Sequence, residues 1–214
     1  MRQVVGQKKH AQFETRNQTT SIEETSGGHV LIEGFSSTEG ICVSYTDDRA
    51  HLKISDFLKL YSRDKCIILC IGTDRFIGDC LGPLTGTLLS KLSLPIPVLG
   101  TLENPVHAIN LRKTMSHIKT FYKDHRVIAI DACLGTSQSV GYIQVKEGSI
   151  QPGRGVGKNL THVGDCSIIG IVDEAVESDD YEYENYLRIN NVRLGLVMKM
   201  SETIAKGIYT AFRQ

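Results

Sequence analysis

The stretch CIILCIGTDRFIGDCLGPLTG, residues 66–86, decides the fold class. It begins with an unbroken apolar run, continues through a glycine-containing loop and ends in a helical pattern. An apolar strand without polar alternation is typical of a parallel sheet that is buried on both faces. The same strand-then-helix order recurs in PIPVLGTL and HAINLRKTMSHIKTFYKDH, residues 95–102 and 107–125, before RVIAIDA, residues 126–132, predicts another buried strand.

We therefore predict a single α/β domain over residues 28–214, with three α/β/α layers and a mostly parallel sheet between helices on both faces. The chain has 214 residues. This length fits one generous domain better than two, because domain sizes cluster near ~100–150 residues.

Further elements are predicted on either side of this centre. HVLIEGF and ICVSY, residues 29–35 and 41–45, predict a hairpin or two edge strands. HLKISDFLKLYSRD, residues 51–64, has helical spacing of its apolar positions. GYIQVKEG and DCSIIGIV, residues 141–148 and 165–172, predict two more strands.

The two ends of the chain differ in character. Residues 1–27 are polar, rich in Gln, Thr, Ser and Glu, and predict a weakly ordered arm. From Leu187 onward the pattern predicts one long amphipathic helix packed on the sheet. Its apolar stripe consists of Ile189, Val192, Leu196, Met200, Ile204, Ile208 and Phe212.

Composition argues against several classes of protein. Lys plus Arg and Asp plus Glu both number 24, so no net charge favours a nucleic acid or an anionic membrane surface. No segment approaches the ~20 apolar residues of a membrane span, and the N-terminus has no signal-peptide core. The cysteines lack CxxC spacing and lie mostly in apolar runs, which predicts free thiols in a reducing cytoplasm. They are Cys42, Cys66, Cys70, Cys80, Cys133 and Cys166.

Two aspartates follow predicted buried strands. Asp79 lies in the loop GTDRFIGDC, and Asp131 ends the apolar run RVIAI. Each has a structural explanation, because Asp is a good helix N-cap and also caps loop amides at strand ends. In an open parallel sheet, however, ligands bind outside the carboxyl ends of the strands. Two carboxylates at one such edge can act as acid and base or share a metal ion.

Other polar residues are candidates for the same edge. His162, in NLTHVGD, is either a solvated loop histidine or a ligand. Glu103, Asn104 and His107 follow the strand predicted in PIPVLGTL, where they either reach the same edge or begin a helix. The glycines of PGRGVGK, residues 152–158, fit a loop better than a phosphate-binding motif, since no Ser or Thr follows the Lys.

The segments CIGTDRFIGDCLGPLTG, VIAIDACLG and IQPGRGVGK together resemble the germination protease family of spore-forming bacteria, especially its shorter YyaC-type sporulation relatives. The resemblance covers roughly residues 63–212. It implies a phosphorylase/hydrolase-like fold, with Asp79 and Asp131 as the catalytic carboxylates. It also implies a peptide or spore-protein substrate and a place in the cytoplasm, the forespore or the spore interior.

The fold is shared with hydrogenase-maturation endopeptidases, which hold nickel with two acids and a histidine. By order and approximate spacing, that likeness implies Asp79, Asp131 and His162 as ligands of a divalent metal, nickel or zinc. The germination proteases work without such a histidine, so a metal-free pair of carboxylates is the other option. A non-catalytic binding or regulatory protein that keeps the fold and the acidic pocket is the alternative function, and self-association is left open.

Overall fold

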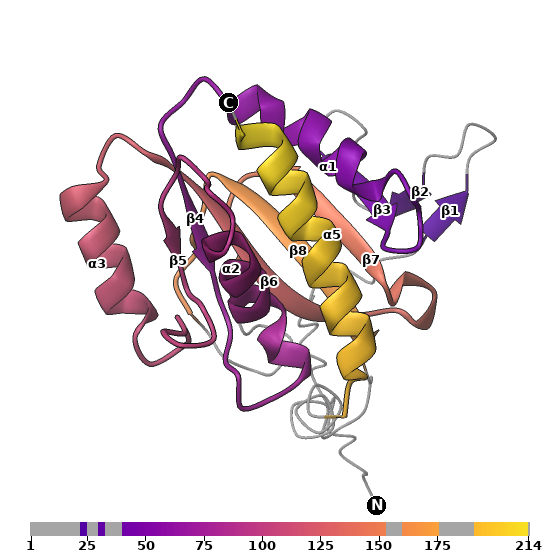
Figure 1. Cartoon of the computed structure of the whole chain (residues 1–214). Helices are drawn as coiled ribbons and strands as arrows, with labels where there is room; N and C mark the ends of the chain where they lie inside the picture. The colour runs from indigo at the N-terminus through magenta and orange to yellow at the C-terminus, as the bar shows by residue number, and fades with distance from the viewer. Residues whose placement is uncertain (1–21, 25–29, 33–39, 153–159, 176–190, 214) are drawn as a thin grey trace, which may run out of the picture.

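The computed structural model describes residues 22–24, 30–32, 40–152, 160–175 and 191–213. A six-stranded sheet forms its centre, in the order β3-β7-β8-β6-β4-β5 (Figure 1). Its strands are β3 (Gly40–Ser44), β4 (Cys66–Cys70), β5 (Val98–Leu99), β6 (Arg126–Gly135), β7 (Tyr142–Glu147) and β8 (Cys166–Glu174).

The sheet is mixed, and most of its pairs are parallel. β5, β4, β6 and β8 pair in parallel, whereas β7 pairs antiparallel with both β8 and β3. The most apolar predicted strand, β4, is buried at every residue and lies between β5 and β6. The predicted α/β domain with a mostly parallel sheet is confirmed.

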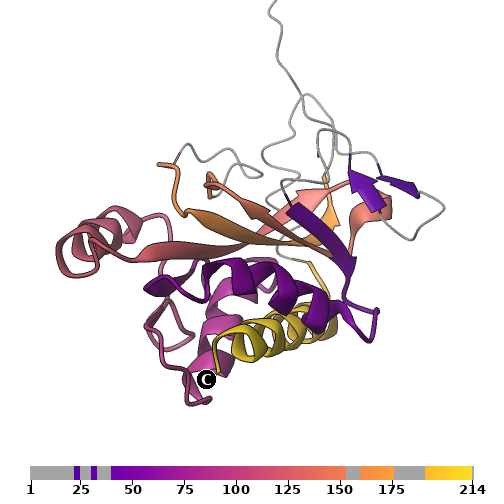
Figure 2. The same ribbon diagram turned by 90° about the horizontal axis from the view of Figure 1, so that it is seen from above.

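Three helices cover one face of the sheet (Figure 2). They are α1 (Ala50–Leu58), α2 (Leu81–Ser90) and α5 (Leu194–Phe212). α5 packs against both α1 and α2. Ile68, Ile130 and Ile168 from the central strands and Met200 and Ile204 from α5 form the core of this face.

A further helix, α3 (Leu111–Phe121), lies at the β5 end of the sheet (Figure 2). Its buried residues Leu111 and Ile118 pack with Leu69 and Ala129, which lie on the other face of the sheet from the three-helix core. Because side chains alternate along a strand, each central strand therefore supplies both cores. Helices on both faces make the three predicted layers.

The N-terminal predictions are only partly correct. Residues 1–21 and 25–29, most of the predicted arm, lie outside the described residues, but Ile22–Glu24 form β1 and pair antiparallel with β2 (Val30–Ile32). The predicted hairpin between residues 29–35 and 41–45 is wrong, because β2 pairs with β1 and β3 pairs with β7. β3 is instead an edge strand of the main sheet, which was the other option.

Other boundaries also differ from the sequence pattern. β6 continues four residues beyond Asp131 to Gly135, because it pairs with β8 beyond the point where β4 ends. α3 begins at Leu111 rather than near His107. α5 begins at Leu194, while residues 187–190 of the predicted helix lie outside the described residues.

All six cysteines are free thiols, as predicted. Cys66, Cys70, Cys80 and Cys166 are buried, and Cys42 and Cys133 are half-buried. Among the described residues, no helix is both long and apolar enough to span a bilayer.

Candidate functional site

Close backbone packing fixes the chain at the carboxyl end of β4. Gly72 has a φ of 138°, and a Cβ atom there would overlap the carbonyl oxygen of Asp79. A Cβ atom on Gly82, in the first turn of α2, would overlap the carbonyl oxygen of Ile71. The start of α2 therefore lies directly against the end of β4, with no side chain between them.

The segment after β5 closes the other side of this junction. A Cβ atom on Gly100, whose φ is 88°, would overlap the carbonyl oxygen of Cys70. Farther on, Val106 forms a parallel bridge with Ile71, and its carbonyl accepts a hydrogen bond of 2.8 Å from the Gly72 amide. Backbone packing holds the ends of both strands together.

Asp79 lies in this junction, within the short 3₁₀ helix η2 (Gly78–Cys80). The residue is half-buried, and its carbonyl accepts a hydrogen bond of 3.1 Å from the Thr73 amide. The N-caps of η2 and α2 are Ile77 and Cys80, and neither makes a side-chain cap hydrogen bond. The N-cap positions of η2 and α2 are therefore held by residues other than Asp79.

Asp131 lies inside β6 and is only 8% exposed. Its predecessor Ile130 pairs with Cys70, the last residue of β4, and the Ile71 amide donates a hydrogen bond of 2.8 Å to the Ile130 carbonyl. Asp131 is therefore the first β6 residue beyond the last β4 pair. The strand alternation places it on the same face as Val127 and Ala129, which belong to the α3-side core.

The structure brings the two aspartate-bearing elements together, because η2 contacts β6. The carboxylates also affect nearby thiols. Burial is the main cause that raises the pKa of Cys80, and Asp74 and Asp79 add to the effect. Burial likewise raises the pKa of Cys133 to about 12, with Asp131 as the next cause. Carboxylates in this setting can accept or donate a proton and can hydrogen-bond a bound water.

His162 does not join the aspartates. It precedes β8, is exposed, and its Nδ1 lies 3.4 Å from the Ser149 hydroxyl oxygen. Three residues later, the Asp165 carboxylate accepts a hydrogen bond of 2.8 Å from the Val127 amide at the start of β6. Among the described residues, no three His, Cys, Asp or Glu side chains form a group that could hold one metal ion. The described residues therefore lend no support to the metal triad of Asp79, Asp131 and His162, which stays a prediction.

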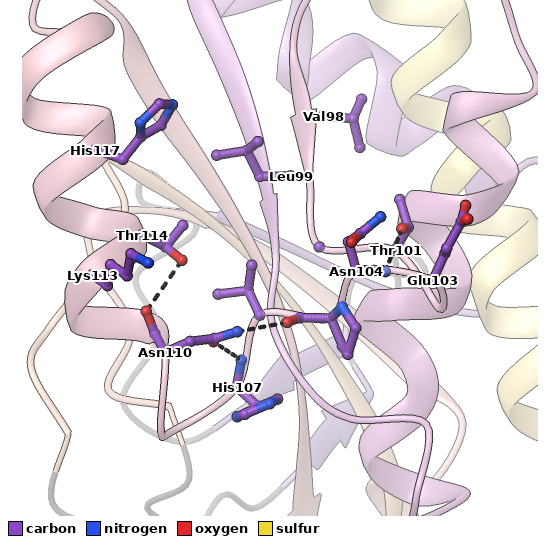
Figure 3. Close-up of a pocket in the computed structure, with 13 residues that line it drawn as sticks. Val98, Leu99, Thr101, Glu103, Asn104, His107, Asn110, Lys113, Thr114 and His117 are labelled. Atoms are coloured by element: carbon purple, nitrogen blue, oxygen red, sulfur yellow. Dashed lines mark hydrogen bonds between the residues drawn. The ribbon is translucent and has the colours of Figure 1, made fainter.

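Glu103, Asn104 and His107 line a pocket of about 710 Å³ between β5 and α3 (Figure 3). Asn104 does not begin a helix, since its amide donates to the Thr101 hydroxyl at 3.1 Å and α3 begins seven residues later. Because β5 is parallel to β4, these residues follow its carboxyl end, and their approach to Asp79 and Asp131 stays a prediction.

Sequence reasoning missed the helix side of this pocket. It consists of Asn110, Lys113, Thr114 and His117, from the N-cap and the first two turns of α3. Their spacing puts them on one face of the helix, while Leu111 and Ile118 point into the core. A polar stripe with this spacing can be recognised in the sequence. It does not by itself indicate a pocket, because the polar face of a helix is usually exposed to solvent.

Residues 42–207 match the family described as protein of unknown function (DUF1256). The chain belongs to this family. It is also similar to the protein described as uncharacterized protein YyaC of Bacillus subtilis (strain 168), with 41% identity over 181 residues. That match covers 81% of this chain and 85% of the relative. The family match over residues 42–207 contains Asp79, Asp131 and every strand of the main sheet except the first two residues of β3.

Proposed function

We propose that this protein is a sporulation-associated peptidase that hydrolyses a peptide bond with Asp79 and Asp131. The observation that carries the proposal is the place of Asp131. This carboxylate is 8% exposed, directly follows the apolar run 127–130 of β6, and lies beside the element that bears Asp79. Burying a carboxylate costs free energy. Use of the Asp131 carboxylate for proton transfer would explain why the protein keeps a carboxylate at this buried position.

In the proposed reaction, one carboxylate accepts a proton from a water molecule, and the water oxygen attacks the carbonyl carbon of the peptide. The carbon–nitrogen bond then breaks, and the other carboxyl group donates a proton to the leaving amine. Each group must reach its proton directly or through one water. The close packing of Gly72 and Gly82 would hold Asp79 in place for these steps.

The resemblance of three segments to germination proteases supports the choice of a peptide bond and of spore proteins as substrates. It also supports a place in the cytoplasm, the forespore or the spore interior. The similarity to a protein of Bacillus subtilis is consistent with this setting. The proposed steps use the two carboxylates alone, and the resemblance to the germination proteases, which work without a metal-ligating histidine, supports this choice.

Proteolysis by the purified protein tests the proposal. The full chain is incubated with small spore proteins, and the products are followed by mass spectrometry. We expect cleavage by the unaltered protein and a loss of at least about 10²-fold in Asp79→Asn and in Asp131→Asn, since removing a general acid or base costs that much.

Asp74→Asn is the matched control, because Asp74 lies in the same loop and is exposed. It should retain the activity of the unaltered protein. Equal cleavage by the Asp79→Asn and Asp131→Asn variants would overturn the proposed site. A folded protein that binds spore proteins without cleaving them would favour the binding or regulatory alternative.

A further inference from the structure

The pocket beside β5 has the form of a groove between a sheet edge and a helix (Figure 3). Its helix wall is formed by Lys113, Thr114 and His117, and the opposite side by the segment that follows β5. Asn110 closes one end: its side-chain nitrogen donates to the Pro105 carbonyl at 2.9 Å, and its side-chain oxygen accepts from the His107 amide at 2.8 Å. The end of the groove is therefore held in a defined shape.

One wall of the groove is a strand edge. Among the described strands, β5 pairs only with β4 and ends the sheet. The Pro97 carbonyl accepts a hydrogen bond of 2.9 Å from the Ile68 amide, so Pro97 directs this group toward β4. Backbone groups of successive residues point to opposite edges of a strand, so the N–H and C=O of Val98 point toward the groove. A strand edge of this kind can pair with another extended chain.

The side chains along the groove are more basic than acidic. Lys113, His107 and His117 line it against one acid, Glu103. α3 itself carries Arg112, Lys113 and Lys119 and no acidic residue. With histidine counted as neutral, the whole chain has no net charge, whereas α3 carries three positive charges and no negative one. This excess on the helix wall of the groove is therefore local and favours an acidic partner.

We infer that this groove binds an extended, acidic peptide segment, which adds to the open edge of β5 as a strand. Its backbone pairs with Val98, and its carboxylates approach Lys113 and His117. The groove leads to the segment 100–106, whose Val106 contacts Gly72 beside Asp79. The inference deepens the proposed function and rests on it in one respect, because it makes the bound segment part of the peptidase substrate.

Binding is measured separately from cleavage, in the full-length Asp79→Asn protein. The probes are fluorescent decapeptides of alternating valine and glutamate, and of alternating valine and lysine. We expect the acidic probe to bind more tightly. Lys113→Glu should weaken its binding about tenfold, since the change replaces attraction by repulsion. Lys119→Glu is the matched control, because Lys119 is an exposed residue of α3 outside the groove.

Two further changes test the backbone pairing. Val98→Pro removes the N–H that points to the groove and leaves the β4 pairing intact, so it should weaken binding about fivefold. The acidic probe is also made with N-methyl groups on all its valines or on all its glutamates. Only one of these two sets faces β5 in a paired strand. We therefore expect one methylated probe to lose binding and the other to retain it.

The outcomes separate this inference from the proposed function. Equal binding of the acidic and basic probes would overturn the inference that the groove binds an acidic strand. Equal binding of the two methylated probes would overturn it as well. Cleavage of spore proteins that is unaffected by Lys113→Glu and Val98→Pro would also overturn it, while the peptidase would stand. Groove-dependent binding without any cleavage by the unaltered protein would support the groove and count against the peptidase.

Discussion

The two faces of the sheet are built in different ways. On the first face, α5 packs against both α1 and α2. The start of α2 also lies so close to β8 that a Cβ atom on Gly170 would overlap the Leu81 side chain. The second face is covered by α3 at the β5 end, and farther along it carries the polar or reactive side chains of Asp131, Cys133 and Cys42. The difference indicates that the first face mainly supplies stability, whereas the candidate chemistry lies along the second face and the edge of the sheet.

The largest effect should come from the junction where the first face meets β4. Gly82→Ala would raise the helix propensity of α2, yet we expect it to destabilise the protein by about 4 kcal/mol or more, because the added Cβ meets backbone atoms of Ile71 that cannot move aside. Gly195→Ala is the matched control. Gly195 is also helical, but nothing lies near its Cβ position, so this change should be neutral or stabilise by up to about 1 kcal/mol.

Urea unfolding followed by circular dichroism measures both variants. Equal stabilities would mean that the backbone contact between α2 and β4 is absent in solution, and the rigid placement of Asp79 would lose its basis.

A second pair of variants compares the two cores. Ile204→Ala removes a fully buried side chain of α5, in the core of the first face, and should cost about 3–4 kcal/mol. Ile118→Ala removes the same atoms from α3. It should cost about 2 kcal/mol, because the smaller α3 cluster at the edge of the sheet can relax into the cavity. Urea unfolding again measures the free energy of unfolding of both variants. A larger loss in Ile118→Ala than in Ile204→Ala would contradict the view that the first face mainly supplies stability.

The sequence predicted the layers well, because they depend on local patterns. The unbroken apolar run of β4 and the 3.6-residue spacing along α5 each determine one element without long-range information. Strand pairing was harder. ICVSY was as compatible with a hairpin partner as with β7, since an edge strand does not encode its partner locally. The end of β6 was placed too early for the same reason, because β8 and not the local pattern extends it past Asp131.

The elements that carry the candidate carboxylates could be identified from the sequence, whereas the role of these residues stays a prediction. Asp79 and Asp131 were singled out from strand-end positions, and η2 and β6 do lie in contact. His162 was placed with them by order along the chain, which says nothing about distance between residues 31 positions apart. The groove side of α3 was missed for another reason. Lys113 and His117 look like solvated residues until the open edge of β5 is known to lie beside them.

Cysteine reactivity sharpens the comparison between the faces. Cys42 and Cys133 are half-buried on the second face, whereas Cys66, Cys70 and Cys166 are buried in the first core. Burial raises the pKa of Cys42 and Cys133 to about 12. Below that pH the thiolate fraction rises about tenfold for each pH unit. We expect iodoacetamide to label these two first, slowly near neutral pH and faster as the pH rises.

Mass spectrometry of the native protein identifies the labelled cysteines. Labelling in urea gives the reaction rate of each of the six thiols in the unfolded chain. Early labelling of Cys70 or Cys166 would show that the first face opens more readily than its packing implies.

The smallest effect is expected at His162. The aspartates belong to elements in contact with each other, but His162 lies on an exposed segment before β8 and its ring contacts Ser149. A metal held by all three residues would need each of them within about 2 Å of the ion. We therefore expect His162→Ala to leave the affinity for nickel and zinc unchanged in calorimetric titrations, with Asp79→Asn as the parallel variant. Two results together would show that the chain closes into the metal site that its resemblance to hydrogenase-maturation endopeptidases implies. They are a loss of affinity in His162→Ala and in Asp79→Asn alike, and binding by the unaltered protein that weakens as the pH falls, because protons compete for the ligands. A metal-assisted reaction would then replace the proposed mechanism, in which the two carboxylates alone accept and donate the protons.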